Sequence, residues 1–280
     1  MNAAEFNEIK TIIETIPAEE WTRHIEESRS YNQIFHLSDL RENAVGFIPV
    51  TKEDIVLELN CGCGAVTGNL LRRAKKVTAV DGDREYCELA KLRHKAAENL
   101  TVVNKTPAEF LQETGETYTC IFMMDTLQRT EHMEEAKRLL ALAAEKLRKG
   151  GLLVVAVPNR YGMRYFAGGA YPGTDKYYSG IDGNFKNVPH TCFSRTELTG
   201  LMKAADFKDL ELYYPYPDHH FPLSVFSDER LPGSGELVTN QLSFNWERFS
   251  IFDENMAFEG IREEGAFPVF SNSYLITGRR

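Results

Sequence analysis

The feature that most constrains the fold is a regular alternation of short apolar runs and helical segments that begins at Asp54. The apolar runs have the length of buried strands and cover residues 55–59, 77–80, 100–103, 120–124 and 152–157. The helical segments between them cover residues 65–74, 85–97 and 133–148. Strands that alternate with helices form βαβ units, in which a parallel sheet is covered on both faces. The sequence therefore predicts an α/β protein with a doubly wound, Rossmann-like sheet.

The segments around this core are different in character. Helical patterns cover 5–16, 18–27 and 34–48, and predict an N-terminal helical cap over residues 1–49. Residues 50–280 are expected to form one domain, in which a helix over 194–205 begins with a capping box. Strands over 210–214 and 273–277 and a helix over 255–264 are also expected. The Gly- and Tyr-rich stretch 160–185, read as irregular and not helical, belongs to a covering insertion over 160–190; a second covers 215–268.

A glycine-rich turn follows the first predicted strand, in the sequence Glu58-Leu59-Asn60-Cys61-Gly62-Cys63-Gly64. In an open α/β sheet, ligands bind beyond the carboxyl ends of the strands, next to this first turn. Gly62 and Gly64 allow a ligand to approach the backbone, and Asn60 is a residue type that accepts a left-handed conformation. A turn needed only for packing is the alternative interpretation.

The residues around the turn narrow the type of ligand. A dinucleotide fingerprint needs a third glycine where Thr67 stands, and no Gly-Lys-Ser/Thr of a phosphate-binding loop follows. The acidic residue Glu58 would repel a diphosphate, whereas it suits a ligand that carries positive charge. Asp81, at the end of the second strand, is placed to accept hydrogen bonds from a ribose diol. A sulfonium nucleoside satisfies both conditions.

With these residues in place, the sequence resembles the class I S-adenosylmethionine-dependent methyltransferases. VLELNCGCGAVTG is similar to their first motif, VTAVD to their ribose-binding strand end, and LRKGGLLVVAVPN to the region of their fifth strand. The resemblance implies a mostly parallel sheet with an antiparallel last strand. HLSDLREN, PNRYGMRYFAGG and YYPYPD also resemble a bacterial subgroup associated with cell-surface polysaccharide synthesis. The chain departs from the family pattern at Asn60, where Gly is usual, and at Gln128, where an acidic residue is common.

The resemblance implies roles for individual residues. Those expected to bind S-adenosylmethionine are Glu58, Asn60, Gly62, Gly64, Asp81, Thr106, Pro107, Ala108, Asp125 and Gln128. From the cap, Arg41, or Tyr31 and His36 beside it, could reach the cofactor carboxylate, and a packing role for them stays open. The implied reaction is in-line methyl transfer, in which the enzyme mainly aligns the acceptor and excludes water.

Acceptor-side residues are expected in the irregular segments. His190 is the candidate general base, which is needed if the acceptor is a hydroxyl. Tyr161, Tyr165, Tyr178 and His219 are candidate substrate contacts, because aromatic faces stack on sugar and planar rings. His219 and His220 could also be a metal pair. The preferred interpretation is polar residues of a surface loop, because the sequence offers no evident third ligand, and no metal site is predicted.

Composition limits the possible partners. The chain has 32 Lys+Arg and 41 Asp+Glu, a formal net charge of -9, so no general attraction to nucleic acid or anionic lipid is expected. No apolar run approaches the roughly 20 residues of a membrane span, and the first residues, MNAAEFNEIK, lack the apolar stretch of a signal peptide. The five cysteines are an odd number, for which free thiols are expected. These features favour a cytoplasmic location.

The leading hypothesis is therefore an O-methyltransferase acting on a sugar, glycan or other small-molecule hydroxyl. A natural-product or peptide acceptor would need the same covered pocket. The departures at Asn60 and Gln128 motivate a second hypothesis, a cofactor-binding protein without catalytic activity. An NAD-dependent oxidoreductase is a third, which the missing third glycine opposes.

Overall fold

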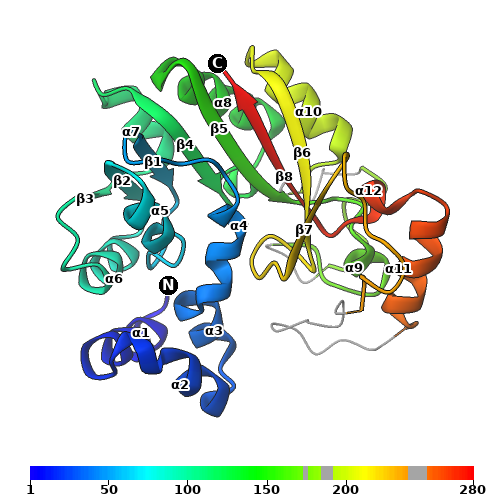
Figure 1. Cartoon of the computed structure of the whole chain (residues 1–280), viewed down its shortest axis with the longest axis horizontal. Coiled ribbons are helices and arrows are strands. Elements are labelled where there is room, and N and C mark those ends of the chain that lie inside the picture. Colours follow the sequence, from blue (N-terminus) through cyan, green and yellow to red (C-terminus); the bar gives the residue numbers. More distant parts are fainter. Residues whose placement is uncertain (173–175, 184–191, 239–250) are drawn as a thin grey trace.

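The computed structural model describes residues 1–172, 176–183, 192–238 and 251–280, and its centre is an eight-stranded sheet. The spatial order of the strands is β3-β2-β1-β4-β5-β8-β6-β7 (Figure 1). Their bounds are β1 Ile55–Leu59, β2 Lys76–Asp81, β3 Leu100–Asn104, β4 Tyr118–Met124, β5 Leu147–Pro158, β6 Lys208–Tyr216, β7 Ser224–Ser227 and β8 Ser273–Arg279. The strand order reverses direction between β1 and β4, so the carboxyl ends of these two strands flank the point where a ligand site is expected.

The strand directions confirm the predicted sheet. β1 pairs in parallel with β2 and β4, and the parallel pairing continues outward to β3 and β5. β8 is antiparallel to both β5 and β6, as expected for the last strand. β7, antiparallel to β6 at the edge, was not predicted. Its four residues lie in a stretch where apolar and polar residues show no long alternation, so pairing with β6 decides its conformation.

Helices cover both faces of the sheet (Figure 1). Their bounds are α1 Ala3–Thr15, α2 Trp21–Ser28, α3 Tyr31–Leu37, α4 Asn43–Gly46, α5 Thr67–Arg73, α6 Arg84–Arg93, α7 Pro107–Glu113, α8 Met133–Lys146, α9 Met163–Phe166, α10 Arg195–Ala204, α11 Glu254–Glu263 and α12 Phe267–Phe270. Short 3-10 helices cover Ala18–Glu20 (η1), Asp39–Glu42 (η2) and Leu127–Arg129 (η3). The capping box predicted for α10 is present, with the Ser194 hydroxyl accepting from Glu197 N.

Several predicted helices differ from those observed. The single helix expected over 34–48 is wrong: α3, η2 and α4 replace it, because Ser38 is extended (φ −64°, ψ 132°) and its hydroxyl accepts from Leu40 N. A cap of this kind ends one helix and begins the next. The stretch 160–185 contains the four-residue helix α9, which was not expected, and α7 and α12 were also missed.

Two apolar layers form the core, one on each face of the sheet. Leu57, Ile121 and Leu153 point to one face, where they pack with buried side chains of α8 and α10. Their neighbours Val56 and Phe122 belong to the other layer, with α4 and α5. Consecutive residues of a strand alternate between faces, so strands covered on both sides must be apolar throughout.

The N-terminal helices pack against α6 through a third apolar cluster (Figure 1). Ile9, Trp21 and Leu37 of these helices share the cluster with Cys63 and Leu89 of the sheet domain. The Arg93 guanidinium donates to the carbonyls of His36 (2.7 Å) and Leu37 (3.3 Å). The cap proposed from the sequence is therefore tied to the loop that follows β1 as well as to α6.

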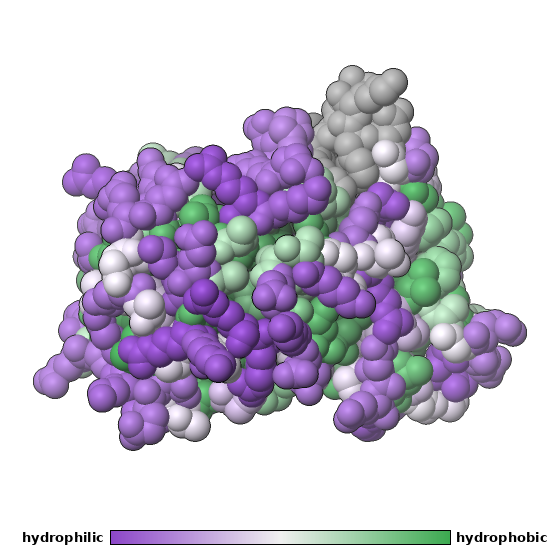
Figure 2. All heavy atoms as spheres, turned by 90° about the horizontal axis from the view of Figure 1, so that it is seen from above, coloured by the Kyte–Doolittle hydropathy of each residue, from purple (hydrophilic) through white to green (hydrophobic). Residues whose placement is uncertain are grey.

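The face of the molecule seen in Figure 2 is mainly polar. It carries hydrophilic side chains with smaller apolar areas between them. All five cysteines are buried. Within the described residues, no helix is both long enough and apolar enough to cross a membrane.

Candidate functional site

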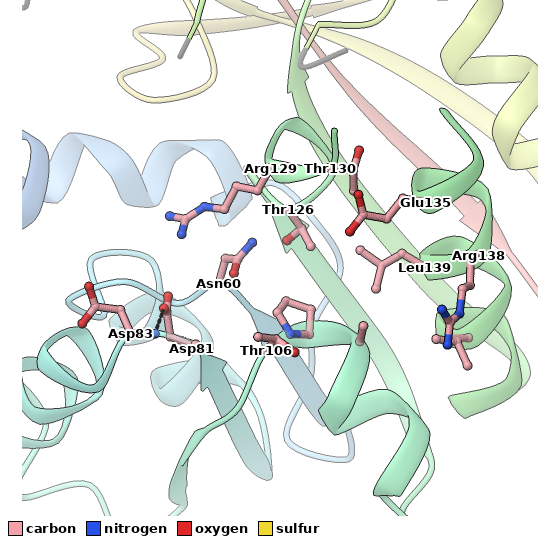
Figure 3. A pocket seen from close by; sticks show the side chains of 14 residues that line it. Asn60, Asp81, Asp83, Thr106, Thr126, Arg129, Thr130, Glu135, Arg138 and Leu139 are labelled. Carbon is pink, nitrogen blue, oxygen red and sulfur yellow. Dashed lines mark hydrogen bonds between the residues drawn. The ribbon is translucent and has the colours of Figure 1, made fainter. Parts of the chain in front are cut away.

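A cavity of about 450 Å³ opens at the carboxyl ends of β1 to β4 (Figure 3). It brings together five of the predicted site residues: Asn60, Asp81, Thr106, Pro107 and Ala108. The remaining lining residues are Gly82, Asp83, Thr126, Arg129, Thr130, Glu135, Arg138, Leu139 and Leu142. The wall is thus polar on the side of β1 and β2 and partly apolar on the side of α7 and α8. Such a wall can hold a planar ring at one end and a polyhydroxyl group at the other.

Asp81 closes the end of β2 and holds the glycine-rich turn in place. Its Oδ2 accepts from Gly62 N (2.9 Å). Its Oδ1 accepts from Asp83 N (2.9 Å), a bond drawn in Figure 3. Gly62 has φ +53°, and a Cβ built there would meet no atom within 4 Å. The left-handed backbone favours glycine at this position, and the empty space beside it lies open to a ligand.

A smaller cavity adjoins the first and shares Asn60 and Arg129 with it. Four further predicted residues line it, namely Arg41, Glu58, Gly62 and Asp125, together with His36 of the cap. Asn60 lies between the two cavities and is left-handed (φ +59°). An asparagine tolerates this conformation better than most residues, so the departure from the family glycine is accommodated by the backbone.

Glu58 is the most strongly perturbed carboxyl group of the β1 turn. It is 2% exposed, and burial raises its pKa to about 7, although Thr67 donates a hydrogen bond to its Oε2 (2.6 Å). Thr67 occupies the position at which a dinucleotide fingerprint needs its third glycine. The chain uses this position to hold an acidic group at the ligand site.

A buried cluster surrounds Asp125, which follows β4 directly. His219 Nε2 lies 2.5 Å from its Oδ1, and His220 Nε2 lies 2.9 Å from its Oδ2. Arg41 approaches from the cap, with Nη2 at 3.6 Å from Oδ2. Burial alone would raise the pKa of Asp125, but His220 and His219 hold it well below the usual range. Burial lowers the pKa of His219, which favours the neutral imidazole.

The interpretation of His219 and His220 as polar residues of a surface loop is wrong. His219 is 4% exposed, and Asp125 supplies the third candidate metal ligand that the sequence did not reveal. Asp125 and His219 are 94 residues apart, which explains why the spacing of residues in the sequence did not indicate a shared metal site. Only the return of the chain after β6 brings the two histidines to the end of β4.

The loop that carries both histidines is fixed by its own hydrogen bonds. The Asp218 carboxylate accepts from the backbone N–H groups of His220 (2.9 Å) and Phe221 (3.1 Å), and pairs with Arg164 (2.5 Å). His219 N donates to Ser273 Oγ (2.8 Å), and Asn272 donates to Pro217 O (3.1 Å). The loop is therefore anchored to β8 and α9, which leaves the two imidazole rings little freedom.

Other predicted residues lie outside these two cavities. Gly64 contacts His94, whose Nε2 lies 2.8 Å from Gly64 O, and Gln128 lies in η3. Tyr31 packs on Phe35 with ring centroids 5.7 Å apart. Tyr165 is buried with Tyr171 and Cys192, Tyr161 contacts Arg160, and Tyr178 is exposed. His190 falls outside the described residues.

Sequence reasoning missed the far wall of the main cavity. Thr126, Arg129 and Thr130 come from the segment after β4, and Glu135 and Arg138 come from the first turns of α8 (Figure 3). The motif after β4 offered a signal, because residues that follow a strand at the switch point reach the ligand crevice. For Glu135 and Arg138 the sequence offered no such signal, because charged residues near the start of a helix are normally exposed to solvent.

Comparisons with known proteins find similar sequences for part of the chain. A family model described as a methyltransferase domain matches residues 56–151. Ubiquinone biosynthesis O-methyltransferases of Mesorhizobium japonicum and Rhizobium rhizogenes are 32% identical over 107 residues and 30% identical over 105 residues. Each match covers 38% of this chain and 41% of the relative, so the chain spans about two fifths of the length of these curated relatives.

Solved structures resemble the chain over most of its length. One is a SAM-dependent methyltransferase of Thermotoga maritima, described as a possible histamine N-methyltransferase, with a TM-score of 0.50 and 17% identity over 96% of this chain and 98% of that one. Another is a SAM-dependent methyltransferase of Archaeoglobus fulgidus, with a TM-score of 0.56 and 13% identity over 89% of this chain and 98% of that one. At these identities the likeness establishes the fold.

Proposed function

We propose that this chain, which carries a class I S-adenosylmethionine-dependent methyltransferase domain, transfers a methyl group from that cofactor to a hydroxyl oxygen of a small molecule. The observation that carries the proposal is the cavity at the ends of β1 to β4, where Asp81, Asn60 and Thr106 face one another. The cofactor supplies a methyl group on a positively charged sulfur, which is already activated for displacement.

The described residues suit this cofactor. Both oxygens of Asp81 retain a lone pair beyond their bonds to Gly62 N and Asp83 N, and a carboxylate so placed can accept from a ribose diol. Pro107, Ala108 and Leu139 offer apolar surface for a purine ring. Glu58 and Asp125 place two acidic groups in the adjoining cavity, which suits the positive charges of the methionine portion.

The same residues oppose the NAD-dependent alternative. A dinucleotide brings a pyrophosphate to the first βα turn. Buried Glu58, held beside this turn by Thr67, would repel the phosphates in its ionised form, which predominates above its pKa of about 7. The departure from the family pattern at Asn60 keeps the turn intact, since Asn60 holds the left-handed backbone, and Gln128 lies outside both cavities.

The hydroxyl acceptor is supported by the relatives' names, which describe O-methyltransferases. A sugar or glycan is the acceptor class that the resemblance to the polysaccharide-associated subgroup favours. His190 remains the proposed general base for such a hydroxyl, and Tyr161 and Tyr178 remain proposed contacts of the acceptor, in an insertion that covers the site. Residues 50–280 are proposed to act as one catalytic domain, with residues 1–49 as its cap.

Calorimetric titration tests the proposal directly. We expect S-adenosylmethionine and S-adenosylhomocysteine to bind with dissociation constants near micromolar, and NAD to give no signal in the same buffer. Binding of NAD alone would overturn the proposal. If the two sulfur nucleosides bind, nucleotide sugars and glycans are the first acceptors to assay by transfer of a labelled methyl group. Binding without transfer to any acceptor hydroxyl would favour the catalytically silent protein.

A further inference from the structure

We propose that Asp125, His219 and His220 form a binding site for a first-row divalent transition metal ion such as Zn²⁺. The three candidate ligand atoms all lie within 4.8 Å of one another. Both imidazole rings direct Nε2 toward the same carboxylate, although the rings are tilted by 37° relative to each other. Three donor groups gathered in this way offer their ligand atoms to a single ion.

The donor set selects the type of ion. Two imidazole nitrogens and one carboxylate oxygen suit Zn²⁺, Fe²⁺ or Co²⁺, whereas Mg²⁺ and Ca²⁺ prefer sites built from oxygen ligands. His219 and Asp125 are 4% and 7% exposed, and His220 is partly exposed. Three protein ligands leave at least one coordination position free, as in catalytic zinc sites.

The surroundings hold the ligands in position before any ion arrives. The Asp218 carboxylate fixes the backbone of His220, and Ser273 Oγ fixes that of His219. Asp125 itself donates its backbone N–H to Ala156 O (3.3 Å), which ties the residue to β5. These bonds fix the backbone positions from which the two imidazole rings and the carboxylate reach one another.

The site lies beside the proposed cofactor cavity. Asp125 lines the small cavity that shares Asn60 with the main one, so an ion at Asp125 would lie next to the place proposed for the methionine portion of the cofactor. The role of the ion in catalysis rests on the proposed function. A divalent ion lowers the pKa of a hydroxyl bound to it. Once the hydroxyl has lost its proton to the proposed general base, its oxygen forms the bond to the methyl carbon while the carbon–sulfur bond breaks.

The effect of Arg41 on metal affinity distinguishes a metal site from a simple ion pair at Asp125. Its Nη2 is 3.6 Å from Asp125 Oδ2, so its charge opposes a cation bound at that carboxylate. Removing this charge should therefore strengthen metal binding. The opposite result is expected if Asp125 only forms an ion pair with its neighbours, since Arg41 would then help to keep the carboxylate ordered.

Titration of the chelator-treated full chain with Co²⁺ tests the site without any acceptor. We expect one Co²⁺ per chain at this site, with visible absorption bands typical of Co²⁺ in a site of low coordination number. Zn²⁺ should displace the Co²⁺, and Mg²⁺ should not. Asp125→Asn and His220→Gln should each weaken Co²⁺ binding more than about 100-fold. Loss of a residue that only supports a metal ligand lowers metal affinity by roughly 10–100-fold. Arg41→Gln should tighten Co²⁺ binding.

His132→Gln is the matched control, because His132 is an exposed histidine outside the cluster. It should bind Co²⁺ like the unaltered chain. Thermal unfolding without metal shows whether each variant folds, and added Zn²⁺ should raise the melting temperature only where the site is intact. Failure of Co²⁺ to bind, or equal binding by Asp125→Asn and His132→Gln, would overturn the metal site. Metal binding without methyl transfer would leave this inference standing and contradict the proposed function.

Discussion

At the scale of single residues, Glu58 illustrates how the fold changes the chemistry of a side chain. Its folded-state pKa of about 7 lies above the ordinary value of 4.5 because the carboxyl group is buried. The folded protein therefore binds this proton more tightly than the unfolded chain. The contribution to stability is complete below pH 4.5 and is lost as the pH rises through 7.

The Glu58→Gln variant isolates this effect, because glutamine keeps an acceptor for the Thr67 hydroxyl and cannot ionise. Between pH 4.5 and pH 8, the free energy of unfolding of the unaltered chain should fall by about 3 kcal/mol relative to the variant. Denaturant unfolding at a series of pH values measures this difference. A constant difference across the range would show that Glu58 has an ordinary pKa.

Asp81 is expected to act mainly on cofactor affinity. Asp81→Ala removes the acceptor for the ribose and the anchor of Gly62 N, so S-adenosylhomocysteine should bind about 1.5–3 kcal/mol more weakly. Calorimetry on a variant that unfolds at a similar temperature measures the effect. Unchanged affinity in the folded variant would remove Asp81 from the site.

At the scale of elements, the turn between β1 and α5 depends on its left-handed residues. Asn60→Gly keeps φ +59° without strain, whereas Asn60→Val forces a β-branched side chain into the same conformation. We expect the valine variant to lose about 1–3 kcal/mol of stability relative to the glycine variant. Denaturant unfolding of the pair gives the comparison, and equal stability would mean that the turn relaxes freely.

The end of β5 is fastened to the segment before β8 by Asn159. Its Nδ2 donates to Val269 O and Ser271 O, both at 2.7 Å, and the side chain is fully buried. Asn159→Asp replaces these donors by oxygen, so we expect a loss of about 3 kcal/mol or more in the free energy of unfolding. Asn104→Asp is the control, since exposed Asn104 also donates to two carbonyls, those of Asp81 and Gly82. A similar cost at both positions would argue against burial as the cause.

At the scale of the whole molecule, the N-terminal helices and the sheet domain share one apolar cluster, and Arg93 joins them through two carbonyls. We therefore expect the cap and the sheet domain to unfold in one cooperative transition. Trp21, the only tryptophan of the cap, lies in that cluster. In a Trp246→Phe variant its fluorescence should change at the same denaturant concentration as the far-ultraviolet circular dichroism. An earlier fluorescence transition would show that the cap opens by itself.

Much of the sheet was predictable because its information is local. Five apolar runs, separated by helical patterns, predicted the five parallel strands. Asp81 and Asn60, which line the main cavity, could be singled out because one ends a strand and the other follows one directly. The short elements β7, α7, α9 and α12 were missed, since four to seven residues carry too little periodicity to outweigh tertiary contacts. The helix over 34–48 was wrong because one cap at Ser38 divides it.

By itself, the sequence determined the α/β class, the glycine-rich turn and the acidic residues at the ends of β1 and β2. Periodicity and the type of residue that follows a strand depend only on residues that are neighbours in the chain, so the sequence alone shows them. Only the tertiary structure decided that His219 and His220 lie buried against Asp125, and that Arg138 of α8 reaches the main cavity. The physical reason is that burial and charge pairing depend on which distant segments pack together, and 94 residues separate Asp125 from His219.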